Sequence, residues 1–407
     1  MTEPVRLLHF ADVHIGMENY GKIDPATGIS SRVMDFLRRL TDIVVYAEDN
    51  DADLAIFAGD AFKTRQPNPT FQREFARRMK RLARQCPVVM LVGNHDLPAM
   101  TQKASSIDIF QTLEVDNVIV GRSDELHWIE TKRGPVQVAT VPYPMRQRLL
   151  SDINTRGHSL LALDDLLREQ VDLLIRNLSD DVDMSIPAVL AGHFSVHGSK
   201  LGSERGVMLG RDVAVLASTV ADPVWDYVAL GHIHYHQDLN KGNYPSVVYS
   251  GSVERIDFGE EGDPKGFCWV NLARDETTYE FIELPARQFL TIRADVREEA
   301  DPTRAVLNAI NEYEVREAVV RVIITATPEN EALIRDRDIQ AALEEAAFVA
   351  GIKREVDYPV RRRLGVERPE QLAPDELLER YLKTKEIAPE RIGALKEAAD
   401  SIFMNEE

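Results

Sequence analysis

The sequence predicts an α/β protein with two sheets in its first 285 residues, followed by a small α+β domain and a helical C-terminal segment. Three observations lead to this prediction. Short apolar runs alternate with amphipathic stretches in the first part of the chain, which is typical of strand–helix–strand units. Several of these runs end in Asp, Asn or His. Beyond Pro285 the order becomes strand, helix, strand, helix, strand, and after residue 360 only two short helical patterns remain.

The first unit spans residues 5–58. The apolar run at 5–10 predicts a buried strand, and 54–58 predicts a second one. Between them, apolar residues recur every three or four positions and predict a helix over about 32–50. A helical crossover makes the two strands parallel, so their carboxyl ends lie at the same edge of a sheet.

A second helix is expected from Pro69 to about Gln85, after the helix-starting run Pro67-Asn68-Pro69. One side is apolar, and the other carries a basic row: Arg73, Arg77, Lys80, Arg81 and Arg84. Two interpretations of this row stay open. It is either a solvated helix face, or a phosphate-contacting ridge or self-association surface.

The remaining elements expected before Pro285 are a strand at 88–90, a short helix at 105–112, strands near 118, 128 and 136–141, a helix at 159–178, strands at 187–191 and 227–230, and β-rich stretches at 247–252 and 266–272. These residues describe two sheets with loops gathered at one edge. No internal repeat is evident.

After the boundary at Pro285, residues 286–360 are expected to form the small α+β domain. Its predicted elements are strands at 289–294, 319–325 and 353–358 and helices at 301–313 and 331–349. Residues 361–407 then form a linker through Pro369 and Pro374 and two short amphipathic helices, marked by residues 377–382 and 392–403. Helices this short cannot bury their apolar faces on each other alone, so we expect them to dock on another surface.

The composition is that of a globular protein. At 407 residues, with 44% hydrophobic and 28% charged residues, the chain can form two or three domains with sizeable cores. No apolar run is long enough to cross a membrane, the start lacks a secretory-signal layout, and the only cysteines are Cys86 and Cys268. We therefore expect a cytoplasmic protein without structural disulfides. The net charge of −19 argues against tight autonomous DNA binding, but not against phosphodiester chemistry at a metal site.

The polar residues at the strand ends are of the types that bind metals. They are Asp12, His14, Asp60, Asn94, His193, His232 and His234. Ligands gather at the carboxyl ends of strands in α/β sheets, so these residues are expected to form one site. Their oxygen and nitrogen donors suit Mn²⁺, Fe²⁺ or Zn²⁺ better than Mg²⁺. Seven ligands fit two metals that share a carboxylate, and Asp60 is the expected bridge because it stands alone at its strand end.

His95 lies beside Asn94 and is expected to approach a phosphate without binding metal, orienting it or protonating the leaving oxygen. We expect Asp96 to orient the imidazole of His95. For any single histidine a structural role would be the better interpretation. Five strand ends that all carry such residues are a much rarer coincidence.

In chain order, Asp-x-His, Gly-Asp, Gly-Asn-His-Asp, Gly-His and Gly-His-x-His resemble the signature of the calcineurin-like metallophosphoesterases, over about residues 7–234. This resemblance implies a four-layer metallophosphoesterase sandwich. The runs at 10–16, 231–234, 249–252 and 255–260 further resemble the SbcD family, the nuclease subunits of bacterial SbcCD complexes. That family implies two Mn²⁺ ions on the seven residues and a catalytic His95. It also implies 3′→5′ exonuclease activity on duplex DNA and endonuclease activity on single strands and hairpins, in break repair and recombination.

The same resemblance implies partners. Residues 286–360 would cap DNA, residues 361–407 would dock on the coiled coil of an SbcC-type ATPase, and helices at about 69–85 and 105–112 would form a homodimer. The sequence has no phosphate-binding loop of the Gly-x-x-x-x-Gly-Lys-Ser/Thr type, so any ATP dependence must come from a second polypeptide.

One position departs from the family pattern. Many relatives carry a histidine three residues after the Asp of Gly-Asp, where this chain has Lys63. Lysine can bind a phosphate as a point charge, but it shuttles protons poorly near neutral pH. We expect Lys63 to contact the substrate. Because of this departure, the resemblance supports the polarity of the exonuclease less directly than it supports metal binding.

Two alternatives remain open. A metallophosphoesterase for small phosphodiesters or phosphoproteins would share the whole ligand set, but would not explain the extra domain and the C-terminal helices. A scaffold that kept the fold and lost catalysis is the other alternative, and the complete ligand set argues against it.

Overall fold

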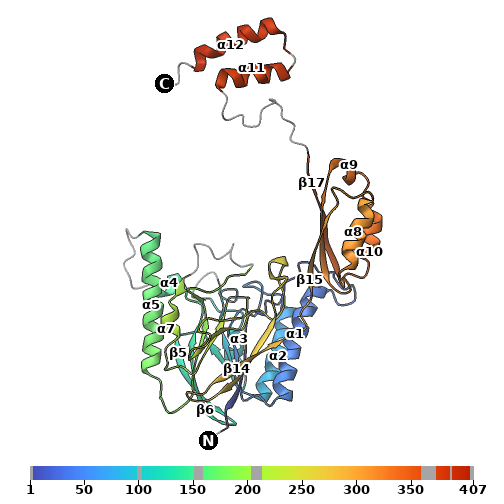
Figure 1. Cartoon of the computed structure of the whole chain (residues 1–407). Coiled ribbons are helices and arrows are strands. Elements are labelled where there is room, and N and C mark those ends of the chain that lie inside the picture. The colour runs from blue at the N-terminus through green and yellow to red at the C-terminus, as the bar shows by residue number, and fades with distance from the viewer. Residues whose placement is uncertain are drawn as a thin grey trace.

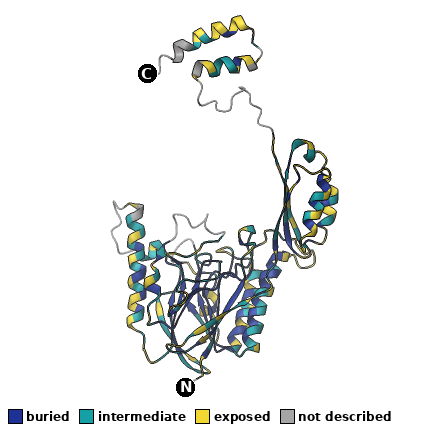
Figure 2. Ribbon diagram, viewed as in Figure 1, coloured by how far each residue is buried: buried dark blue, intermediate teal, exposed yellow. Residues whose placement is uncertain are grey.

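The computed structural model describes residues 3–98, 103–150, 159–202, 213–358, 373–385 and 387–403. Within these ranges the chain forms two six-stranded sheets, a three-stranded sheet and a two-stranded ribbon (Figure 1). Buried residues concentrate in the two large sheets and in the helix faces that cover them (Figure 2).

The first large sheet has the strand order β14-β13-β1-β2-β3-β4. Its strands are β1 (Val5–Phe10), β2 (Leu54–Phe57), β3 (Val88–Leu91), β4 (Val118–Gly121), β13 (Gly266–Leu272) and β14 (Thr278–Glu283). The four from β1 to β4 run parallel to one another, whereas β13 and β14 run antiparallel to their neighbours.

The second large sheet has the order β11-β12-β10-β7-β6-β5. Its strands are β5 (Glu125–Thr131), β6 (Gly134–Val141), β7 (Ala188–His193), β10 (Tyr227–Gly231), β11 (Gln237–Asp238) and β12 (Ser246–Tyr249). The two-stranded ribbon pairs β8 (Ser195–Val196) with β9 (Ala214–Val215). Strands β6, β7, β10 and β12 are parallel.

The helices of this part are α1 (Ser31–Asp49), α2 (Pro69–Gln85), α3 (Asp108–Thr112), α4 (Arg146–Leu149), α5 (Leu160–Asp180), α7 (Ala217–Val220) and the 3₁₀ turn η1 (Phe258–Glu260). N-cap residues fix where the helices α1 and α2 begin. Ser30 accepts a hydrogen bond from the Arg32 amide, and Asn68 accepts one from the Thr70 amide, with Pro69 in the first turn.

Three hydrophobic cores separate four layers. One core joins α1 and α2 to the first sheet, the second lies between the two sheets, and the third joins the second sheet to α5 and α7. In Figure 1, α1 and α2 lie on one side of the paired sheets and α5 on the other. The predicted α/β fold with two sheets flanked by helices is confirmed.

Strand register places the functional loops together. In the first sheet Phe10 pairs with Phe57, and Phe57 pairs with Met90, so β1, β2 and β3 end side by side. In the second sheet Gly231 at the end of β10 pairs with His193 at the end of β7. The loops that follow these five strands therefore emerge at one edge of the sandwich.

Residues 289–356 form a third unit with its own hydrophobic core. Its elements are β15 (Phe289–Asp295), α8 (Pro302–Asn311), β16 (Val319–Ala326), α9 (Pro328–Glu331), α10 (Asp336–Ala342) and β17 (Phe348–Val356), and the three strands pair in parallel in sequence order. Figure 1 shows its helices on one face of this sheet.

Two expected elements of this unit differ from the structure. The helix expected over 331–349 is wrong: α9 and α10 are separate and short, and turns follow α10. The third strand begins at Phe348 rather than at residue 353, because Phe348 pairs with Val319 of β16. Ile334, between α9 and α10, and Leu343 and Ala346, after α10, lie in the core, so tertiary packing outweighs the helical propensity of the Ala- and Glu-rich run.

The C-terminal helices α11 (Pro374–Thr384) and α12 (Pro389–Phe403) pack on each other. Leu382 and Ile392 are buried, and Glu379 forms an ion pair with Lys396. Tyr381 and Leu395 stay exposed on them. Most of the expected linker falls outside the described residues. Among the residues that the structure does describe, no helix combines the length and the apolar character needed to cross a bilayer.

Candidate metal centre

All seven predicted ligands lie at one edge of the sandwich and are linked by short contacts. Asp12 and His14 follow β1, Asp60 follows β2 and Asn94 follows β3, while His193 ends β7 and His232 and His234 follow β10. Both sheets therefore contribute, which is why residues more than 200 positions apart in the sequence meet.

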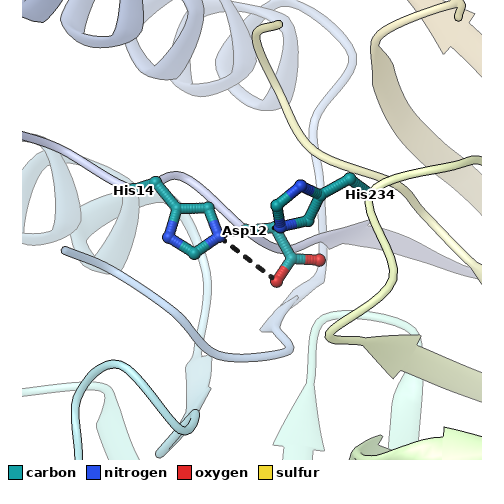
Figure 3. A group of neighbouring side chains, drawn as sticks. All are labelled: Asp12, His14 and His234. Atoms are coloured by element: carbon teal, nitrogen blue, oxygen red, sulfur yellow. Dashed lines mark hydrogen bonds and ion pairs between the residues drawn. The ribbon is translucent and has the colours of Figure 1, made fainter. Parts of the chain in front are cut away.

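Asp12, His14 and His234 form one half of the centre (Figure 3). The Nε2 atoms of His14 and His234 are 3.0 Å apart, and Nε2 of His14 lies 4.0 Å from Oδ1 of Asp12. All three side chains are buried. Their donor atoms thus surround a single point.

His193, His232 and Asn94 form the other half. The Asn94 side-chain oxygen is 3.0 Å from Nε2 of His193 and 3.0 Å from Nδ1 of His232. The two imidazole rings lie edge to face, with centroids 5.1 Å apart.

Asp60 lies between the two halves. Its Oδ2 atom is 3.7 Å from Nε2 of His14 and 3.5 Å from Nε2 of His193. Asp60 is also shared by two groups of donor atoms, one with His14 and His95 and one with Asp12 and His193. This is the position expected for a carboxylate that bridges two cations.

Backbone strain accompanies the ligand positions. Asp12, His14, Asp60 and His232 all have positive φ, at 52°, 46°, 61° and 92°. Residues with a Cβ atom adopt this region only when the surroundings impose it, and such strain concentrates at functional sites. The Asp12 carboxylate helps to impose it by accepting a hydrogen bond from the His232 amide.

Two glycines make room for the ligands. A Cβ atom at Gly93 would collide with the Asp60 carboxylate, and one at Gly59, where φ is +99°, would collide with the His193 ring. The Gly-Asp and Gly-Asn motifs thus have a steric cause, since the backbone passes close behind a ligand.

Hydrogen bonds from Nδ1 fix the tautomers of two predicted ligand histidines, His234 and His193. Nδ1 of His234 donates to the carboxylate of Glu260 at 2.9 Å, and Nδ1 of His193 donates to the Ala58 carbonyl. A carboxylate and a carbonyl can only accept, so in each neutral ring Nε2 carries the lone pair. Such partners orient histidines that bind metals.

Glu260 contacts a predicted ligand, His234, and was not among the residues expected from the sequence. It is fully buried in η1, and its second oxygen accepts from Lys265 at 2.9 Å and from the Ile256 amide. Lys265, also buried, donates to the His234 carbonyl as well. Glu260 ends the run at 255–260, which carries part of the family resemblance, but the spacing of these residues in the sequence does not predict a contact with His234.

Replacing Glu260 by glutamine is expected to weaken Mn²⁺ binding about 10- to 100-fold, because an amide orients the His234 ring less firmly and lowers its basicity. Titration calorimetry with Mn²⁺ measures the change. Glu254→Gln is the matched control. Glu254 is equally buried, but its carboxylate accepts from the Arg255 and Arg287 amides rather than from a ligand. Equal losses in both variants would contradict the orienting role of Glu260.

The electrostatics of the centre favour cations. Burial alone would lower the pKa of His193, but the Asp60 carboxylate outweighs burial and raises it to about 9. Burial likewise opposes ionisation of Asp60, yet the neighbouring histidines His193, His95 and His14 hold the pKa of this carboxyl far below its ordinary value. Without metal, a proton on His193 balances the carboxylate, and metal binding would displace it.

The donor set fits divalent metal ions. Nε2 of His234 faces Nε2 of His14, and Nε2 of His193 faces the oxygen of Asn94, each pair 3.0 Å apart. Without metal, His14 and His193 can each donate an Nε2–H across these distances, and a divalent cation would take the place of that proton. Burial lowers the pKa of His14 well below its ordinary value, so its ring is neutral, as a metal ligand must be. A mixed set of imidazole nitrogens and carboxylate or amide oxygens suits borderline divalent metals.

His95 lies at the same centre but is not buried. Its amide donates to Asp60 Oδ1 at 2.8 Å, and its ring lies edge-on to His14 with centroids 4.9 Å apart. Nδ1 donates to the Lys63 carbonyl at 2.8 Å, which leaves Nε2 as the other functional nitrogen. The ring lies close enough to His14 and Asp60 to belong to a candidate ligand group.

The orienting contact of His95 differs from the expectation. The sequence predicts that Asp96 holds this imidazole, but the ring hydrogen bond goes to the Lys63 carbonyl. The Asp96 carboxylate instead accepts from the amides of Gly93, Asp60 and Ala61. Asp96 turns inward because these amides would otherwise be buried without a partner. Burial and the nearby Asp60 charge raise the pKa of Asp96 to about 7.

The chain resembles known phosphoesterases. The family model for calcineurin-like phosphoesterases matches residues 5–236. The SbcD component of the nuclease SbcCD from Escherichia coli K12 is 28% identical over 301 residues, which cover 71% of this chain and 70% of that protein. The corresponding SbcCD component from Bacillus subtilis is 28% identical over 292 residues, covering 69% and 70%. The DNA double-strand break repair protein Mre11 from Methanosarcina acetivorans is 25% identical over 358 residues, covering 87% of this chain and 51% of that protein.

Proposed function

The chain belongs to the calcineurin-like phosphoesterase family, and from this premise we propose that it is a Mn²⁺-dependent DNA nuclease. It acts as a 3′→5′ exonuclease on duplex DNA and as an endonuclease on single strands and hairpins, together with an SbcC-type ATPase in DNA break repair and recombination. The observation that carries the proposal is the position of Asp60 between two groups of ligand atoms. The names of the similar proteins supply the substrate class.

The proposed ligands are Asp12, His14, Asp60, Asn94, His193, His232 and His234. Two divalent ions held by these residues would supply Lewis acidity towards a phosphate and would lower the pKa of bound water. The chain itself orients the reaction. Asp12 and Asp60 provide the fixed negative charge that retains cations, and Glu260 holds the His234 ring in position.

His95 is the proposed catalytic residue. Its Nδ1 atom is engaged by the Lys63 carbonyl, so Nε2 is the atom that can hold a proton for the leaving oxygen. The Lys63 ammonium group is the proposed substrate contact, a positive charge on the loop that fixes His95. Asp96 positions Asp60 and Gly93 through their amides.

The two C-terminal parts distinguish a DNA enzyme from a small-molecule phosphoesterase. Residues 286–360 are the proposed DNA-capping domain, and residues 361–407 are the proposed docking segment for the ATPase. Tyr381 and Leu395 remain exposed on the paired helices α11 and α12, which supports a further partner for this surface. A phosphoesterase for small molecules or phosphoproteins would have no evident use for either part.

The proposed homodimer uses helices at about 69–85 and 105–112. Ile109 on α3 and Leu113 directly after it are exposed, at 50% and 68%, and they provide an apolar surface for a second copy. In the basic row, Arg73 and Arg77 pair with Glu74, and Arg81 pairs with Glu48. These ion pairs neutralise part of the positive charge of the basic row, so less of it is left to bind phosphates.

A comparison of substrates tests the proposal directly. With Mn²⁺, the protein is expected to cleave duplex and hairpin DNA with a higher kcat/KM than it shows for a cyclic nucleotide or a phosphopeptide. Preference for the small substrates would favour the alternative phosphoesterase. Failure to bind Mn²⁺ at all would favour a catalytically silent scaffold.

Removing residues 370–407 is expected to abolish binding of an SbcC-type ATPase while basal nuclease activity remains. The three-stranded unit and the sandwich have separate cores that do not include this segment. Co-purification with the ATPase and a nuclease assay on the same preparation measure both effects. If the ATPase still binds, the docking segment lies elsewhere in the chain.

A further inference from the structure

A cavity opens at the same edge of the sandwich as the metal centre. It lies between the loop after β3, the start of the α3 region, the end of β4 and the segment after β6. The loop after β3 also carries Asn94, His95 and Asp96. The cavity and the centre are therefore built by neighbouring segments.

Tyr143 is the wall between the two sites. Its side chain lines the cavity, and its ring lies 5.6 Å from the ring of His232 and 6.4 Å from that of His193. Its amide donates to the Val92 carbonyl at 3.1 Å, which ties the segment after β6 to the loop that carries the metal ligands. A group bound in the cavity would thus sit next to the substrate at the metals.

The lining combines an apolar wall with positive charge. Val92, Leu97, Pro142 and Met145 supply the apolar part. The positive charge comes from Lys103 and from the guanidinium groups of Arg122 and Arg148, and Asp108 and Asp124 balance part of it. A cationic rim around an apolar wall is the chemistry of a nucleotide site, with the base on the wall and a phosphate at the rim.

The two arginines are oriented and remain accessible. Arg122 pairs with Asp108 at 3.1 Å and its side chain is 49% exposed, while Arg148 pairs with Asp124 at 2.8 Å and is 34% exposed. Each ion pair holds the guanidinium group in one place without covering it. A fixed, partly exposed guanidinium group can still donate hydrogen bonds to a phosphate.

We propose that the nucleotide adjacent to the cleaved phosphodiester binds at the mouth of this cavity, which has a volume of about 90 Å³, with the edge of its base against Tyr143 and Met145 and its phosphate on Arg148. This inference rests on the proposed nuclease function and deepens it by assigning a substrate subsite. The subsite discriminates a polynucleotide from a small phosphodiester, because only a substrate that continues past the cleaved bond reaches it.

Arg148→Gln tests the charged part of the subsite in the full-length protein. In the presence of EDTA, the Kd for a single-stranded oligonucleotide is expected to rise about tenfold, as for the loss of one charged hydrogen bond. The slope of log Kd against log salt should fall by about 0.7, the value for one phosphate contact on a single strand. Fluorescence anisotropy measures both quantities.

Arg146→Gln is the matched control. Arg146 lies on the same short helix α4, its side chain is 35% exposed, and it pairs with an aspartate, Asp164, at 2.6 Å, but it does not line the cavity. Its Kd and salt slope are expected to match those of the unmodified protein. Equal effects of both substitutions would overturn the subsite, since general surface charge would then explain them.

Met145→Trp tests the apolar part by filling the cavity. With Mn²⁺, kcat/KM for the oligonucleotide should fall at least about tenfold more than kcat/KM for methyl p-nitrophenyl phosphate, which has only a methyl group in place of the neighbouring nucleotide. Equal losses on both substrates would overturn the proposal, because the variant would then act on the metal centre or on folding. If the unmodified protein hydrolyses methyl p-nitrophenyl phosphate but neither binds nor cleaves DNA, the proposed nuclease function fails and the subsite with it.

Discussion

Asp60→Asn is expected to leave at most one Mn²⁺ per chain and to lower kcat/KM for DNA by about 10³-fold or more. The Asp60 carboxylate lies within 3.7 Å of both His14 and His193, so it is the proposed shared ligand of the two halves. An amide offers one weak oxygen donor in place of two charged ones. A dimetal centre contributes several kcal/mol of transition-state stabilisation, which corresponds to this loss of rate.

The loss of a buried charge must be separated from the loss of a ligand. Asp226→Asn serves as the control, because Asp226 is fully buried but lies just before β10, at the strand end opposite the metal centre, where it binds Arg274 and Tyr244. This variant should unfold at a lower temperature and still bind two ions per chain. Inductively coupled plasma mass spectrometry gives the metal content. Two ions in Asp60→Asn would exclude a bridging role.

His95→Ala is expected to abolish DNA cleavage, with a loss of about 10²- to 10⁴-fold, while nearly all of the bound metal remains. The side chain lies beside His14 and Asp60, but its Nδ1 atom is held by the Lys63 carbonyl. The loss should be much smaller on bis(p-nitrophenyl) phosphate, because p-nitrophenolate leaves without being protonated. A rate assay on both substrates separates proton donation from metal binding.

His127→Ala is the control for a histidine outside the centre. His127 lies on β5 and contacts the Thr140 hydroxyl. It should change neither the metal content nor the ratio of the two rates. Loss of both metals in His95→Ala would refute the role of His95 as a residue that does not bind metal, and it would instead support the ligand group with His14 and Asp60.

The elements of the sandwich could be predicted where a pattern within a short stretch of sequence marks them. Buried strands such as β1 and β3 are continuous apolar runs, and α1 and α2 carry clear caps and apolar stripes. The strand β14 was not expected, because it is an edge strand with partly exposed side chains and has no continuous apolar run. The helix expected at 331–349 failed for the opposite reason: its local propensity is strong, but pairing of β17 with β16 is a long-range interaction.

The grouping of the site residues followed from one rule, that loops after parallel strands share an edge. That rule brought Asp12, Asp60 and His193 together without any knowledge of distances. It could not find Glu260, which lies on a 3₁₀ turn and reaches His234 only through the tertiary fold. Nor could it show that the Asp96 carboxylate turns towards backbone amides, because this depends on which buried amides lack another partner.

The number and position of bound metal ions test the account most directly. Anomalous scattering from crystals soaked in Mn²⁺ should show two peaks per chain about 3.5–4 Å apart, with Asp60 between them. Asp12, His14 and His234 should surround one ion, and Asn94, His193 and His232 the other. A single ion, or two ions that do not share Asp60, would contradict the proposed centre and the nuclease mechanism built on it.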